Sequence, residues 1–198
     1  MSEDVLLRSQ GALDLMLGRR DRGWSRLDLS ADGFWNSFLA IPVCAPALLV
    51  ILLTHARWLA AGGVEASTAA MLVVLIATEL ANWVLTLLAV VLLARPLGLG
   101  QRVSHLVVAL NWGSVTFAYL RALPAALALL VGLGEGLAVA MLTITLVSLV
   151  LYWRLLAAAM EADAARTTAV FVATVALGYG LTSAVQSAFG LVPTAVAQ

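Results

Sequence analysis

The chain has 198 residues, of which 63% are hydrophobic and 11% charged, and its mean hydropathy is +1.02. Eleven basic residues, all of them Arg, balance eleven acidic ones, so the formal net charge is zero. A soluble domain needs a polar surface that this composition cannot provide, and a neutral chain has no net field to attract nucleic acid. We therefore expect an integral membrane protein and no nucleic-acid partner.

Half of the charged residues lie in residues 1–33, which we predict to be a cytoplasmic N-terminal segment. Its apolar residues fall on roughly one side of a helix: Val5, Leu6, Leu13, Met16 and Leu17. This pattern predicts an amphipathic helix at the membrane interface, with a flexible charged tail as the alternative. Arg19, Arg20 and Arg22 follow this segment, and we expect them to bind anionic lipid headgroups.

Residues 34–191 are predicted to cross the membrane five times. A transmembrane helix needs about 20 mainly apolar residues to cross about 30 Å of hydrocarbon. Four runs fit this template: residues 34–54, 68–94, 136–156 and 168–191. A longer run begins at Val103, and Pro124 predicts that its span ends near Arg121, with a kinked or interfacial continuation to residue 133. The predicted fold is an all-α transmembrane helical bundle, followed by a tail of residues 192–198.

The distribution of Arg predicts the orientation, because cytoplasmic loops are enriched in positive residues. With the N-terminus in the cytoplasm, nine of the eleven Arg lie on the cytoplasmic side. A six-span chain would place Arg154 and Arg166 on the opposite side, so the charge bias favours five spans. We expect a protein of the bacterial inner membrane with its C-terminus in the periplasm.

Glu79 lies near the middle of the second span, where an ionised carboxylate needs a partner or a shifted pKa. Counted along the helices, Asn82 and Asn111 lie at a similar depth, which predicts a polar site formed by the three residues. This site is either a proton or ligand site or a hydrogen-bonded contact between helices. Arg121 lies about 15 Å farther along in this prediction, so we expect it to extend toward the membrane surface.

The last span carries small residues at a spacing of four. They are Ala176, Gly180, Ala184 and Ala188. Such a row lets two helix backbones approach closely, either within the bundle or between protomers, and we favour packing within the bundle.

No residue pattern predicts a reaction or a cofactor. Cys44 is the only cysteine, so neither a disulfide nor a thiolate metal cluster is expected. His55 and His105 lie near opposite membrane surfaces and cannot share a metal ion. Nucleotide-binding, hydrolase and metalloprotease motifs do not occur. We predict a protein that is not an enzyme and that holds no metal or cofactor.

Several landmarks resemble a known family. Asp28 to Phe38 reads DLSADGFWNSF before a span with two prolines, GLGQRVSH begins at Gly98, and YWRLLAAAM begins at Tyr152. The chain is similar in these features to the bacterial branch of the Yip family, whose members have five spans and no agreed catalytic residues. The resemblance implies a five-helix bundle with a cytoplasmic N-terminus. The eukaryotic members resemble trafficking factors that bind small GTPases.

Two functions follow as hypotheses. The first is a structural, scaffolding or accessory protein that binds membrane lipids, other membrane proteins or a second copy of itself. The second is a small transporter or a proton or ion carrier that uses Glu79, Asn82 and Asn111.

Overall fold

The structure is a computed structural model and describes residues 2–132 and 134–193. All regular elements in this part of the chain are helical. In chain order they are α1 (Ser2–Met16), α2 (Arg20–Arg26), α3 (Ala31–Asn36), the 3-10 turn η1 (Ser37–Leu39), α4 (Ala40–Ala61), α5 (Thr68–Ala94), the 3-10 turn η2 (Gly100–Arg102), α6 (Val103–Val131), α7 (Glu135–Met160) and α8 (Ala164–Ala188).

Five helical stretches are long and apolar enough to cross a membrane, which confirms the predicted number of spans. The first combines α3, η1 and α4 over Ala31–Ala61, and the second has the predicted bounds of Thr68–Ala94. The fourth, α7, begins one residue before and ends four residues after its predicted bounds, and the fifth, α8, begins four and ends three residues before its predicted bounds. The chain is therefore a membrane-spanning helical bundle.

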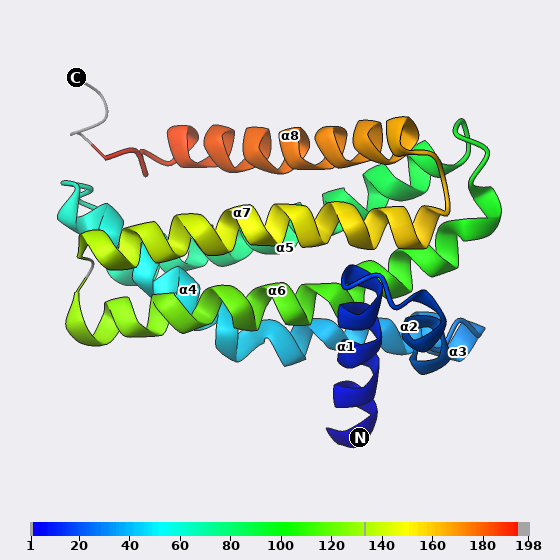
Figure 1. The fold of residues 1–198 in the computed structure, drawn as a ribbon. Helices are drawn as coiled ribbons and strands as arrows, with labels where there is room; N and C mark the ends of the chain where they lie inside the picture. Colours follow the sequence, from blue (N-terminus) through cyan, green and yellow to red (C-terminus); the bar gives the residue numbers. More distant parts are fainter. Residues whose placement is uncertain (1, 133, 194–198) are drawn as a thin grey trace.

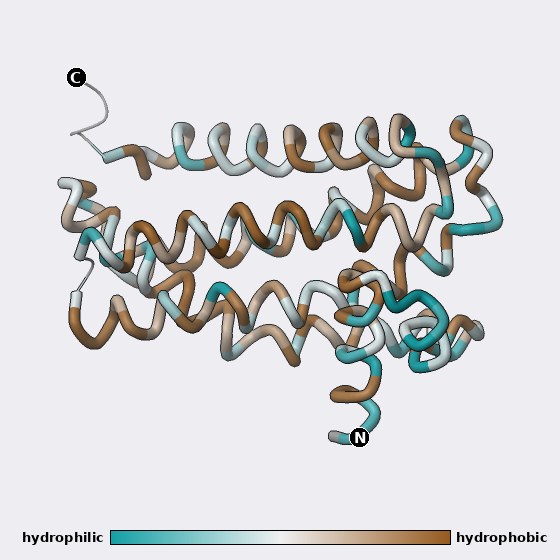
Figure 2. The backbone as a smooth tube through the Cα atoms, in the orientation of Figure 1, coloured by the Kyte–Doolittle hydropathy of each residue, from teal (hydrophilic) through white to brown (hydrophobic). Residues whose placement is uncertain are grey.

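The long helices lie side by side, with α8 on one side of the bundle and α4 with α6 on the other (Figure 1). Helices α5 and α7 lie between them and pack against both sides. The short helices α1 to α3 gather at one end, which we call the α1 end, and α8 ends at the opposite end (Figure 1). The predicted tail lies mostly outside the described residues, which end at residue 193. Hydrophilic residues concentrate in the N-terminal segment and in the connections, whereas the long helices are mainly hydrophobic (Figure 2).

The predicted end of the third span near Arg121 is wrong. Helix α6 continues through Pro124 to Val131 without interruption. Proline removes one backbone donor and crowds the preceding turn, so a helix that continues past it benefits from packing and from substitute hydrogen bonds.

Helix α4 donates two hydrogen bonds to the part of α6 that follows Pro124. The Thr54 hydroxyl donates to the backbone oxygen of Ala125 at 3.0 Å. The Arg57 guanidinium donates to the backbone oxygen of Leu129, also at 3.0 Å. The carbonyl groups in the last turn of a helix have no partner within the helix, so Arg57 satisfies one that would otherwise be unpaired.

Helix α1 crosses the bundle at a steep angle and packs on α6 and α7 (Figure 1). Its residues Ala12, Leu15 and Met16 are fully buried, and the Arg154 side chain of α7 donates a hydrogen bond to the Met16 backbone oxygen. The residues predicted to form one apolar side do not all pack on the bundle, because Leu6 and Leu17 are exposed. The segment is therefore helical and attached to the bundle at its C-terminal end, whereas its position at a membrane interface stays a prediction.

Most of the large exposed apolar side chains lie on the long helices. In α6, eight successive residues from Leu106 to Gly113 are buried, because α1, α3, α4 and α7 surround this part of the helix. Large apolar side chains of α5 and α7 face outward instead, including Val73, Val84, Leu142 and Val150. An outward apolar surface of this kind fits a lipid environment.

Candidate functional site

Glu79 of α5 forms an ion pair with Arg121 of α6. The Arg121 Nη2 atom lies 3.7 Å from the Glu79 Oε1 atom. Glu79 is about 16 Å along α5 from Thr68, and Arg121 is about 15 Å along α6 from Val131, so both lie at the same depth from the end opposite α1. The expectation that Arg121 extends to the membrane surface is wrong, because it placed the end of α6 about ten residues too early.

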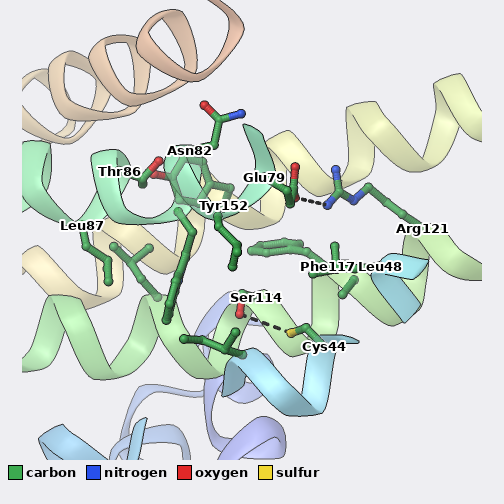
Figure 3. A pocket seen from close by; sticks show the side chains of 15 residues that line it. Cys44, Leu48, Glu79, Asn82, Thr86, Leu87, Ser114, Phe117, Arg121 and Tyr152 are labelled. Carbon is green, nitrogen blue, oxygen red and sulfur yellow. Dashed lines mark hydrogen bonds and ion pairs between the residues drawn. The ribbon is translucent and has the colours of Figure 1, made fainter. Parts of the chain in front are cut away.

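This ion pair borders a cavity of about 230 Å³ between α4, α5 and α6 (Figure 3). The cavity walls are largely aromatic and aliphatic, and Trp83, Leu87, Phe117 and Tyr152 contribute to them. Figure 3 shows Phe117 and Tyr152 pointing into the space beside Glu79. The site therefore combines one pair of opposite charges with an apolar interior.

Polar groups other than the ion pair also line this cavity. Cys44 of α4 and Ser114 of α6 form a hydrogen bond with 3.6 Å between Sγ and Oγ (Figure 3). The Tyr152 hydroxyl donates to the Thr174 hydroxyl of α8 at 3.0 Å. Glu79 and Arg121 are the only Asp, Glu, Lys or Arg residues of the lining, so the ion pair is the only charged feature of the cavity among the described residues.

A second cavity, of about 340 Å³, lies between α4, α6 and α7. Its lining includes His55, Trp58, Met141 and Thr145, and it shares Arg121 with the first cavity. The Arg121 side chain is 42% exposed, and Glu79 is 39% exposed. Arg121 thus borders both cavities at mid-depth in the bundle.

The structure places only part of the predicted polar site together. Glu79 and Asn82 line the same cavity, but the Asn82 amide points away from the ion pair and donates to Thr182 of α8 at 2.9 Å (Figure 3). Asn111 is fully buried on another face of α6 and donates to the Ser37 hydroxyl at 2.8 Å. The three residues do not form one cluster, because Asn111 lies about 12 Å from the α1 end of its helix and Glu79 about 22 Å from that end of α5.

The row of small residues on α8 faces outward. All four members, Ala176, Gly180, Ala184 and Ala188, are exposed. A Cβ atom built at Gly180 would meet no described atom within 4 Å. Our preference for packing of this row inside the bundle is wrong, because α8 uses its other face, with Thr167, Val170 and Thr174 buried.

The N-terminal Arg cluster is organised around Asp14. Its carboxylate, almost fully buried, forms ion pairs with Arg19 at 3.3 Å, Arg22 at 3.4 Å and Arg26 at 2.7 Å. Arg20 is exposed. Arg19 and Arg22 are thus tied to the protein at one side while 59% of each side chain stays exposed. Their binding to lipid headgroups stays a prediction.

In residues 2–132 and 134–193, no group of three or more His, Cys, Asp or Glu side chains is arranged to hold a metal ion. Comparison with protein-family models, with curated proteins and with solved structures finds no match to this chain.

Proposed function

We propose that this chain is a non-enzymatic integral membrane protein that binds a lipid or a lipid-like molecule in the cavity beside Glu79 and Arg121. The ion pair and its exposure support this proposal. A charge at the bilayer centre is costly, so charged side chains within spans pair with one another and face the bundle interior or a cavity, where they often mark a functional site. Here both partners are about two-fifths exposed and border an apolar cavity.

The composition of the cavity favours an apolar ligand over a hydrated ion. Ligand sites of small molecules are typically concave and apolar, with a few polar groups that orient the ligand. The walls near Trp83, Leu87 and Phe117 match that description, and the ion pair supplies the polar groups. A water-filled ion path would instead need further polar side chains along its length.

Native mass spectrometry of the protein extracted with its surrounding lipid tests this proposal. We expect the wild type to retain a bound lipid or amphiphile. Ala118→Leu enlarges a buried residue of the cavity wall and should reduce this retention. Ala184→Leu, on the exposed face of α8, should leave it unchanged. Absence of a bound molecule in the wild type, or equal retention in all three proteins, would count against the proposal.

A second candidate function is association with another membrane protein or a second copy through α8. It is supported by the outward row that contains Gly180, since exposed small residues allow close helix approach in a bilayer. Gly180→Leu should weaken self-association or partner recovery measured by cross-linking in membranes. Thr143→Leu, at an exposed position of α7, is the matched control. Equal cross-linking in both variants would exclude this surface.

An odd number of spans would leave the α1 end and the C-terminal end of α8 on opposite sides of the membrane. We propose that the α1 end is cytoplasmic and the C-terminus periplasmic in a bacterial inner membrane, because Arg residues concentrate in the segments at the α1 end. Membership of the Yip family likewise stays a proposal. A C-terminal alkaline phosphatase fusion that is inactive, paired with a fluorescent GFP fusion, would overturn the orientation.

A further inference from the structure

Arg121 has more hydrogen-bond donors than the described chain uses. A guanidinium carries five N–H groups in one plane. The 3.7 Å contact with Glu79 is too long for a hydrogen bond, and the Arg121 Nε atom is buried without a hydrogen-bond partner in the described residues. Such a fork is suited to the two oxygens of one acidic group.

The space around Arg121 is suited to a long apolar body. The first cavity extends from Arg121 along Phe117 and Leu87, and the second extends along Trp58 and Ile144. Neither lining contains a second Arg, so the charge of Arg121 matches a ligand head with one negative charge and not a head with two. A single-chain molecule with one acidic head is the class that fits both features.

Because Glu79 is itself a carboxylate, a proton must be bound together with such a ligand. Two carboxylates beside one guanidinium in a low-dielectric site repel each other, so one of them takes up a proton. The titratable groups that line the two cavities from the packed helices are Cys44 and His55 of α4, Tyr152 of α7 and the ion pair itself. Helix α8 adds no residue to either lining. Among the described residues that line the two cavities, Arg121 is thus the only Arg or Lys side chain and Glu79 is the only carboxylate.

From this geometry we infer that Arg121 binds the head of a long-chain carboxylic acid and that Glu79 accepts the proton of that acid. The ligand arrives from the lipid as the neutral acid, because the charged form is costly there. Its O–H bond breaks, the proton joins a Glu79 oxygen, and the ligand carboxylate replaces Glu79 as the partner of Arg121. One O–H bond is lost and one is formed, so the net charge of the site does not change.

This inference rests on the proposed function and adds the ligand class and the proton step to it. Binding would be measured in nanodiscs of zwitterionic lipid with three radiolabelled probes of equal chain length: dodecanoate, dodecanol and dodecylsulfonate. Dodecylsulfonate stays anionic, so any proton taken up with it must go to the protein. We expect the wild type to bind both acidic probes about tenfold or more tightly than dodecanol near pH 6.

The variants separate the two parts of the inference. Arg121→Gln should lose the preference for acidic probes, and Arg166→Gln, exposed near the start of α8, should keep it. Should Arg121→Gln fold poorly, the neutral pair Glu79→Gln with Arg121→Gln gives the same test. For dodecylsulfonate, the affinity of the wild type should fall by up to about tenfold per pH unit as the pH rises, whereas Glu79→Gln should bind equally at each pH.

Four results would overturn the inference. Equal binding of all three probes by the wild type, or an acidic preference that persists without Arg121, would exclude the anion site but leave the cavity as a lipid site. An identical pH dependence in the wild type and Glu79→Gln would exclude the proton step. Binding of no probe at all, together with no lipid in native mass spectrometry, would remove the proposed function itself.

Discussion

Replacing Gly33 with Ala should destabilise the entry to the first span, although Ala favours helices in general. A Cβ atom at Gly33 would lie 2.3 Å from both the Cγ atom and the backbone oxygen of Asp28. A side chain could move aside, but a backbone oxygen in a tight turn cannot move without breaking that turn. The Asp28 carboxylate accepts hydrogen bonds from the Ser30 backbone at 3.0 Å and the Ser30 hydroxyl at 2.6 Å.

The expected loss of unfolding free energy in Gly33→Ala follows from these two hydrogen bonds. A hydrogen bond to a charged group contributes about 1.5–3 kcal/mol, and less where the group is partly exposed, as Asp28 is. The higher helix propensity of Ala offsets about 1 kcal/mol of this loss. The net loss of unfolding free energy should be about 1–3 kcal/mol, which corresponds to a fall of roughly 2–12 °C in Tm for a chain of this size.

Thermal unfolding in a mild detergent, followed by fluorescence-detected size exclusion, would measure this loss. Gly180→Ala is the matched control, because its Cβ atom meets nothing within 4 Å and the helix propensity of Ala should raise Tm or leave it unchanged. If Gly33→Ala were as stable as Gly180→Ala, the turn of Asp28 and Ser30 would not hold the start of the span as described.

Two further predictions concern the ends of the spans. Arg57→Leu leaves the Leu129 carbonyl without its donor, so amide hydrogen exchange should accelerate over residues 126–131; unchanged exchange would refute a capping role. Hydrogen bonds from the Ser30 side chain and backbone hold the pKa of Asp28 below its ordinary value of 3.8, so Asp28 stabilises the fold at neutral pH and loses that effect as the pH falls through its folded-state pKa. The difference in Tm between the wild type and Asp28→Asn should therefore shrink below about pH 4, and a constant difference would contradict this.

The number of spans could be predicted from hydropathy, because each span needs a run of apolar residues of known length. The second span is the clearest case, since turn-forming residues flank it at both ends and its bounds are correct at Thr68 and Ala94. The third span was predicted too short because Pro124 was treated as a helix end. The hydrogen-bond donors to α6 beyond Pro124 are Thr54 and Arg57, about 70 residues earlier in the chain. A local sequence pattern does not show contacts between residues so far apart.

The wrong end of the third span also explains why the predicted polar site includes Asn111 and not Arg121. With α6 ending at Arg121, Glu79 lacked a cation at its own depth, and Asn111 was the nearest polar residue. A count of depth from Val131 instead would have paired Glu79 with Arg121. The direction of the α8 row could not be predicted in the same way, because the spacing that includes Gly180 gives a helix face and not the neighbour that the face meets.

The ion pair between Glu79 and Arg121 is the central claim, and charge reversal measured as a double-mutant cycle in nanodiscs tests it most directly. Glu79→Arg and Arg121→Glu should each lower Tm, since each places like charges together. We expect the double variant to recover most of the loss, with a coupling of about 1 kcal/mol or more, and Glu79→Arg combined with Arg57→Glu not to recover it. Additive losses in the first pair, with no recovery, would contradict it.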